Sequence, residues 1–180
     1  MTGDLQSRPR LRLVTGARDA GKTRWCERAV ADLRAAGHEV RGLLSPGVFE
    51  AGRKVAIRVR DLRSGEERLL ATRRPEAGAG PSRSWEFDEA VLTWADARLQ
   101  ETGRCHTLVV DELGPMELQA NRGWTSVWSV LRERAFTQAI LAVRPALLAV
   151  LRDQVARLGG FEIETVRVSE GKDGNDHPGR

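Results

Sequence analysis

Two glycines, a lysine and a threonine lie near the N-terminus at a spacing that suits phosphate binding. They belong to the segment Gly16-Ala17-Arg18-Asp19-Ala20-Gly21-Lys22-Thr23. This segment fits the pattern G-x-x-x-x-G-K-[ST], in which glycines let the backbone wrap around phosphates with several N–H groups pointing inward. Lys22 supplies a compact charge for the β- and γ-phosphates, and the Thr23 hydroxyl supplies a ligand for Mg²⁺. With the next residue, Arg24, this segment is the predicted phosphate loop.

A second group of chemically active residues follows a continuous apolar run in the middle of the chain. Residues 107–110 are typical of a strand buried on both faces, and Asp111 and Glu112 come directly after them. Ligands of open α/β sheets gather at the carboxyl ends of the strands. We therefore expect Asp111 to bind Mg²⁺ directly or through its hydration shell. Glu112 is expected to polarise a water for attack on the γ-phosphate; a solvated acidic pair is the alternative.

The phosphate loop needs a strand before it and a helix after it, and the flanking sequence predicts both. Residues 10–15 alternate between polar and apolar side chains, as in a strand that ends at Gly16. Residues 22–36 carry apolar side chains at three- and four-residue spacing, as in a helix, and Gly37 can stop it. The N-terminal end of that helix adds a positive field to the loop. An ordinary glycine-rich turn is the alternative interpretation.

Strand-like and helix-like segments alternate along the rest of the chain. Strands are predicted at residues 39–45, 54–62, 67–71, 107–110, 138–143 and 161–168. Helices are predicted at residues 88–100, 125–134 and 145–158. Residues 54–71 form a hairpin, and Pro46 and Gly47 form a turn. This order predicts an α/β fold with a largely parallel sheet and an inserted β-hairpin.

The length of 180 residues corresponds to one domain. We expect a single folded domain over residues 10–168, after a flexible N-terminus over residues 1–9. Residues 169–180 are polar and rich in glycine, and they are expected to form a disordered tail. Residues 73–83 are rich in proline, glycine and alanine, which favours a flexible loop.

Cysteine use and hydropathy indicate the cytoplasm. No apolar run approaches the ~18 residues of a membrane span, and residues 1–10 lack the apolar centre of a signal peptide. Cys26 and Cys105 lie far apart, and no C-x-x-C pair occurs, which argues against a zinc site. We therefore expect a cytoplasmic protein with reduced thiols and no membrane partner.

Arginine dominates the basic residues. Lysine occurs only at positions 22, 54 and 172, and 26 of the 29 basic residues are arginine. This preference is typical of the coding bias of a GC-rich genome, and a surface for an anionic partner is the alternative. The net charge is only +4 because 25 acidic residues are interspersed. We expect a monomer with no specific nucleic-acid partner, and the sequence identifies no protein partner.

The residues after the buried strand extend the acidic pair into a longer motif. The run is Asp111-Glu112-Leu113-Gly114-Pro115-Met116-Glu117-Leu118. Together with the phosphate loop, it resembles the cancer-related nucleoside-triphosphatase family of small P-loop proteins over residues 11–168. The resemblance implies a P-loop NTPase fold, Rossmann-like and three-layered with a mixed sheet. It also implies Mg²⁺-dependent hydrolysis of ATP, GTP and other nucleoside triphosphates to the diphosphate.

The sequence departs from the family pattern at three places. Residues 17–20 stand where the family has small residues and proline, and Arg24 stands where a second threonine is common. Residues 43–52 lack the usual aromatic and acidic pattern. The chain therefore resembles a divergent member, whose physiological substrate can differ.

Five further side chains are weaker candidates. Arg144, at the end of a predicted strand, is placed to reach the γ-phosphate as a sensor or internal arginine finger, or is a surface arginine. Arg18 is expected to contact phosphate or close over the nucleotide, with a solvated loop tip as the alternative. Glu117 orients the turn of the acidic motif or caps a helix. Trp85 and Phe87 either stack on a base or, as buried aromatics usually do, belong to the core.

The motifs predict a nucleoside-triphosphatase that acts on ATP or another nucleoside triphosphate. Glu112 positions the attacking water and Lys22 neutralises developing charge, while Mg²⁺ bridges the β- and γ-oxygens. A small-molecule or nucleotide kinase uses the same loop, with residues 73–83 as a lid, although Glu112 makes wasteful hydrolysis easier. A nucleotide-gated binding module for protein or nucleic acid is a third hypothesis. The absence of an N-K-x-D motif disfavours a GTP switch.

Overall fold

The computed structural model describes residues 8–74 and 85–169. The predicted flexible segments at the N-terminus and at residues 73–83, and the predicted tail, lie largely outside the described residues. They stay predictions. Among the described helices, none has the length and apolar character to cross a membrane.

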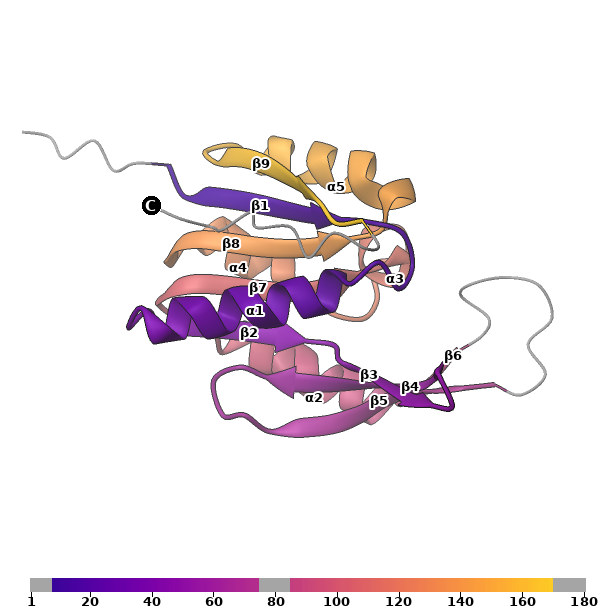
Figure 1. Ribbon diagram of the computed structural model, residues 1–180. Helices are drawn as coiled ribbons and strands as arrows, with labels where there is room; N and C mark the ends of the chain where they lie inside the picture. Colours follow the sequence, from indigo (N-terminus) through magenta and orange to yellow (C-terminus); the bar gives the residue numbers. More distant parts are fainter. Residues whose placement is uncertain (1–7, 75–84, 170–180) are drawn as a thin grey trace, which may run out of the picture.

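Five parallel strands form one half of a nine-stranded sheet, in the order β2-β7-β8-β1-β9. They are β1 (Arg10–Thr15), β2 (Val40–Leu44), β7 (Cys105–Leu113), β8 (Phe136–Val143) and β9 (Glu162–Arg167). All five point toward the same edge of the sheet, at the right of Figure 1. The predicted α/β fold is therefore confirmed, with a mixed sheet of which this half is parallel. β7 is longer than predicted, so that Asp111 and Glu112 lie within the strand.

The other half of the sheet is antiparallel and larger than the single inserted hairpin that the sequence predicted. Its strands are β3 (Gly47–Glu50), β4 (Arg53–Asp61), β5 (Glu67–Arg73) and β6 (Trp85–Phe87), which we call the antiparallel extension. β4 pairs with β2 and so joins the extension to the parallel half. β3 and β5 pair with β4, and β6 pairs with β5. The turn predicted at Pro46 and Gly47 is wrong, because Gly47 already begins β3.

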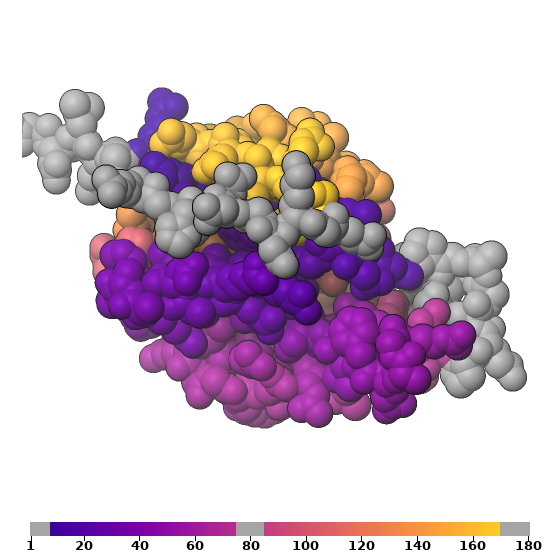
Figure 2. Space-filling view, in the orientation of Figure 1, coloured from indigo at the N-terminus to yellow at the C-terminus, as the bar shows by residue number. Residues whose placement is uncertain are grey.

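Helices cover both faces of the sheet and give three layers. One face carries α1 (Lys22–Ala35), which crosses Figure 2 between β9 (yellow) and the antiparallel extension (magenta). The other face carries α2 (Glu89–Gln100), α4 (Val127–Glu133) and α5 (Pro145–Leu158), with the short α3 (Pro115–Leu118) after β7. The predicted helices are therefore present, with ends shifted by one or two residues.

Two hydrophobic clusters fill the space between the layers, one on each face of the sheet. Alternate residues of a strand point to opposite faces, so Leu141 of β8 joins the larger cluster under α2, α4 and α5, and Ile140 joins the cluster under α1. Both side chains are fully buried. Each such burial contributes about 1.5–3 kcal/mol to folding, which fixes the carboxyl ends of the central strands in place.

The helix starts differ in how their backbone N–H groups are satisfied. Asp88 caps α2, because its carboxylate accepts hydrogen bonds from the backbone N–H groups of Ala90 and Val91 at 2.9 and 3.2 Å. α1 begins after Gly21 without a side-chain cap and without an acidic residue in its first turn. Its first N–H groups and its positive dipole end are therefore directed at the phosphate loop, where an anion can satisfy them.

Candidate functional site

The phosphate loop connects the end of β1 to the start of α1 at the edge where the parallel strands end. Gly21 has a φ of 94° and Asp19 a φ of 59°, so both lie in the left-handed region. A side chain at Gly16 would place its Cβ 2.4 Å from the carbonyl oxygen of Val168. Glycine is therefore required at the two positions for different reasons. Gly21 needs its left-handed backbone angle, and Gly16 lies too close to the segment after β9 for a side chain.

Lys22 lies across the loop that it follows. Its Nζ donates hydrogen bonds to the carbonyl oxygens of Gly16 and Ala17, each at 2.9 Å, and the residue is 7% exposed. Burial lowers the pKa of Lys22 from its ordinary value of 10.5, and Glu112 opposes that shift while Arg144 adds to it. The ammonium group is thus held inside the loop, close to both of these charged side chains.

Asp111 and Thr23 meet beneath the loop. Asp111 is fully buried, and its Oδ2 accepts a hydrogen bond from the backbone N–H of Ser45 at 3.1 Å. The Thr23 side chain hydrogen-bonds the same carboxylate. Burial, followed by the charge of Glu112, raises the pKa of Asp111 to about 6. The Ser45 hydroxyl donates in turn to the Asp111 carbonyl oxygen at 3.1 Å.

The surroundings of the Asp111 carboxylate show whether Mg²⁺ would fit at this site. Its Oδ1 is buried and has no hydrogen-bond partner among residues 8–74 and 85–169. A buried carboxylate oxygen without a partner costs free energy, and a cation removes that cost. Mg²⁺ is commonly held by one or two protein oxygens together with phosphates and water. The Asp111 carboxylate and the Thr23 hydroxyl therefore form a donor set that suits this ion.

Glu112 has an unusual backbone conformation. Its φ is 68°, which is rare for a residue with a side chain. The pairing register of β7 and β8 shifts between Val110 and Leu113, so the strand is irregular at this point. Such irregularities re-aim side chains and cluster at functional sites. Here the irregularity lets the buried Asp111 and the half-buried Glu112 serve the same site from adjacent positions.

Arg144 pairs with Glu112, which the sequence prediction did not include. Its Nε and Nη2 donate to Glu112 Oε1 at 3.1 and 2.7 Å. Burial alone would raise the pKa of Glu112, but the hydrogen bonds and charge of Arg144 outweigh it and hold the pKa below 4.5. From the sequence, Arg144 was expected to reach the γ-phosphate or to be a surface arginine. Neither expectation included its ion pair with Glu112. The two residues form one ion pair at the ends of neighbouring strands.

Glu117 supports the turn that follows Glu112. Its Oε2 accepts from the Gly114 N–H at 2.9 Å, and its Oε1 accepts from the Trp124 N–H at 3.2 Å. Gly123 makes room for it, because a Cβ there would lie 2.0 Å from Oε1. Glu117 also stands at the third residue of α3, where it completes a cap. The sequence suggested that Glu117 either orients the turn or caps a helix. The same contacts of its carboxylate serve both roles.

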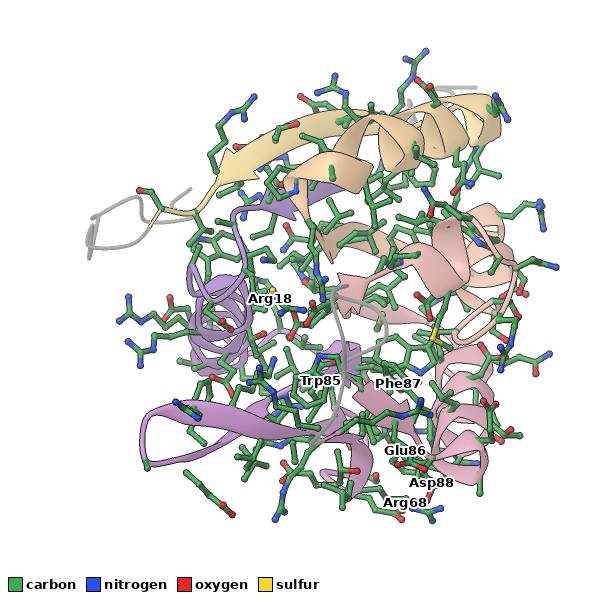
Figure 3. The ribbon with its side chains drawn as sticks, turned by 90° about the vertical axis from the view of Figure 1, so that its right-hand side faces the viewer. Arg18, Arg68, Trp85, Glu86, Phe87 and Asp88 are labelled. Atoms are coloured by element: carbon green, nitrogen blue, oxygen red, sulfur yellow. The ribbon has the colours of Figure 1, made fainter. Side chains whose placement is uncertain are left out.

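A cleft of about 1350 Å³ runs from the phosphate loop to the antiparallel extension. Arg18, Arg24, Glu112 and Arg144 line it together with Lys22 and Thr23. Figure 3 looks onto this edge of the sheet and labels Arg18 from the phosphate loop and Trp85 from β6. Among the described residues, the lining holds eight cationic and three acidic side chains, so the cleft attracts anions.

The two aromatic candidates differ in one respect. Both Trp85 and Phe87 pack against the larger hydrophobic cluster, and Trp85 also lines the cleft whereas Phe87 does not. Four lining residues were not singled out as site residues from the sequence, namely Phe49, Arg53, Arg73 and Arg74. Ser45, which donates to Asp111, was not singled out either. The alternation of residues 54–62 was visible, and Lys54 is one of three lysines, but neither pattern showed that β4 faces the phosphate loop.

Comparisons with known proteins agree with this arrangement. The family model described as NTPase matches residues 12–173. The protein named nucleoside-triphosphatase THEP1 of Thermofilum pendens is 36% identical over 110 residues, 59% of this chain and 59% of that protein. Its namesake of Methanopyrus kandleri is 32% identical over 111 residues, 61% of this chain and 60% of that protein. The chain therefore matches about 60% of the length of these relatives.

Two solved structures share the fold. The solution structure of a human cancer-related nucleoside triphosphatase superposes with a TM-score of 0.65 at 21% identity and covers 90% of both chains. The crystal structure of THEP1 from Aquifex aeolicus superposes with a TM-score of 0.57 at 16% identity, covering 88% of this chain and 90% of that one. The predicted Rossmann-like P-loop fold is therefore confirmed.

Proposed function

The chain belongs to the NTPase family, and from that premise we propose that it hydrolyses nucleoside 5′-triphosphates to the diphosphate and phosphate, with Mg²⁺ as cofactor. One observation carries the proposal. The fully buried Asp111 keeps a carboxylate oxygen without a partner, and it contacts Thr23 directly after the phosphate-loop lysine. This is the arrangement that a metal-bound triphosphate needs.

The phosphate loop binds the triphosphate. The backbone N–H groups of residues 16–24 and the uncapped start of α1 supply donors and a positive field. Lys22 exchanges its two carbonyl contacts for oxygens of the β- and γ-phosphates. Thr23 and Asp111 would hold Mg²⁺, which would supply positive charge to neutralise the phosphate oxygens.

Glu112 and Arg144 serve the γ-phosphate end. Glu112 is ionised at neutral pH because its pKa is lowered, so it can accept a hydrogen bond from water and take up its proton. Only Oε1 is bound by Arg144, which leaves Oε2 to orient the water for in-line attack. Arg144 stabilises charge that develops on the γ-phosphate from its position beside Glu112.

Phosphate release from a panel of nucleoside triphosphates tests this proposal, with Mg²⁺ and with a chelator. We expect turnover that requires Mg²⁺ and that Lys22→Ala abolishes. Turnover at the wild-type rate in Lys22→Ala, or in the presence of the chelator, contradicts the proposal. Cytoplasmic location and a monomeric state stay predictions from the sequence.

A further inference from the structure

Four basic side chains of the antiparallel extension line the cleft beyond Glu112 and Arg144. They are Arg53, Lys54, Arg73 and Arg74. None of them forms an ion pair with a residue in the described ranges 8–74 and 85–169. Their charge is therefore available to an anion in the cleft. We call these four residues, with Phe49 and Trp85, the basic arm.

The basic side chains on other parts of the same strands are arranged differently. Arg58 and Arg60 of β4 both bind Glu67, at 3.1 and 2.7 Å. Arg68 of β5 binds Glu66 at 2.7 Å. Unpaired basic side chains are thus gathered at the cleft, while those away from it are neutralised by neighbours. Coding bias raises the arginine content at all positions alike. It therefore does not explain why the basic side chains without an ion pair lie at the cleft.

Two aromatic side chains belong to the same arm. Phe49 is 59% exposed, which is unusual for a large apolar side chain, and Trp85 is half-buried. The Lys54 ammonium lies 6.0 Å from the centre of the Trp85 ring. Phe49 stands opposite Lys54 in the β3–β4 pairing, and Trp85 stands opposite Arg73 in the β5–β6 pairing. A ring and a cation are therefore cross-strand neighbours in both pairings of the arm.

In the proposed function, the phosphates of the triphosphate bind to the phosphate loop, Lys22 and the ion on Thr23 and Asp111, so they do not require the cations of this arm. The cleft volume of about 1350 Å³ exceeds the roughly 300–1,000 Å³ typical of a site for one small ligand. The cations that form no ion pair with a described residue can bind a second phosphate group, and the exposed Phe49 ring and the half-buried Trp85 ring can stack on a planar group.

We propose that the basic arm binds a nucleoside 5′-monophosphate alongside the triphosphate. The phosphate of this second ligand binds among Arg53, Arg73 and Arg74, and its base stacks on Phe49 or Trp85. The proposal rests on the proposed function in one respect, namely that the triphosphate fills the phosphate loop. It adds a second ligand class that hydrolysis alone does not require.

Calorimetry with AMP as the probe tests the second site. AMP is titrated into the full chain after the phosphate loop has been saturated with Mg²⁺ and a non-hydrolysable ATP analogue. We expect saturable binding of one AMP per chain. The double variant Arg53→Ala/Arg74→Ala should weaken AMP binding at least tenfold. Neither side chain bonds to a described residue, so the variant keeps its fold, as a thermal melt can verify.

The matched control removes two paired cations from the same strands of the extension. Arg58→Ala/Arg60→Ala loses the same charge, but these residues bind Glu67 and do not line the cleft. This variant should bind AMP within twofold of the wild type. An equal loss in both double variants would show that only overall charge matters, and would overturn the proposal.

Three further outcomes separate this site from the proposed function. Displacement of the analogue by AMP, or an equal loss of analogue and AMP affinity in Arg53→Ala/Arg74→Ala, would place the triphosphate's own base in the arm and overturn the proposal. Binding of a 5′-phosphorylated oligonucleotide far tighter than AMP would overturn it in favour of nucleic acid. AMP binding that persists in a protein without hydrolytic activity would support the basic arm while the proposed function fails.

Discussion

Replacing Glu112 by glutamine tests the assignment of the water-orienting group. The change keeps the size of the side chain, and the amide oxygen can still accept from Arg144, so the fold of the turn is retained. What is lost is one negative charge beside the γ-phosphate position. Because the pKa of Glu112 is held below 4.5, the group is fully ionised at neutral pH but is a weak base.

The expected loss follows from that weak basicity. A positioned general base contributes about 10²–10⁴-fold, and a base with a pKa far below the working pH contributes toward the lower end. We therefore expect kcat to fall by about 10²–10³-fold, or about 3–4 kcal/mol of transition-state stabilisation. Affinity for the triphosphate should be kept or improved, because the charge of Arg144 is no longer neutralised.

Single-turnover hydrolysis and calorimetry with a non-hydrolysable analogue separate these two effects. Glu27→Gln is the matched control, since Glu27 also lines the cleft but stands in the second turn of α1, whereas Glu112 is the carboxylate that pairs with Arg144. Its kcat should stay within threefold of the wild type. If Glu112→Gln hydrolyses at the wild-type rate, another group orients the water. If it instead loses more than tenfold in affinity, Glu112 acts in binding.

Three further predictions concern the loop, the metal ligand and the turn. Lys22→Ala should weaken triphosphate binding by about 2–3 kcal/mol, the value of a charge-assisted contact to phosphate, and unchanged affinity by calorimetry contradicts the loop assignment. Asp111→Asn should raise the Mg²⁺ concentration needed for half-maximal rate as well as slow turnover, and an unchanged Mg²⁺ requirement would place the ion elsewhere. Burial raises the pKa of Glu117 above its ordinary value of 4.5, so the folded state holds its proton more tightly than the unfolded chain does. The free energy of unfolding of the wild type should therefore fall relative to Glu117→Gln as the pH rises above 4.5, measured by urea unfolding, and parallel pH curves would refute this.

The phosphate loop and Asp111 were predictable from the sequence because their chemistry is local. Residues 16–24 carry the whole binding pattern in one segment, and a buried apolar run ends at the acidic pair. Spacing within one segment fixes which side chains meet, whatever the rest of the chain does. The strand–loop–helix context could also be inferred from hydrophobic periodicity on either side.

The contacts between distant segments were not predictable in this way. Arg144 meets Glu112 only because β7 and β8 are neighbours and because β7 is irregular at Val110–Leu113. Ser45 reaches Asp111 because β2 lies beside β7. The basic arm exists because β4 pairs antiparallel with β2 and turns the extension toward the loop. Strand order is not encoded in periodicity, so these partners needed the structure.

Three departures from local rules lie at one place in the molecule, although others of the same kind occur, for example the positive φ of Arg134 after α4. Asp19 and Glu112 have positive φ without being glycine, and Asp111 buries a carboxylate oxygen that no group in the described residues satisfies. Each such feature costs about 1–3 kcal/mol. Here all three lie at the edge where the parallel strands end, against a lysine held inside the loop. In the proposed function, a bound cation would satisfy the unpaired oxygen, and a triphosphate would replace the two loop carbonyls as partners of the lysine.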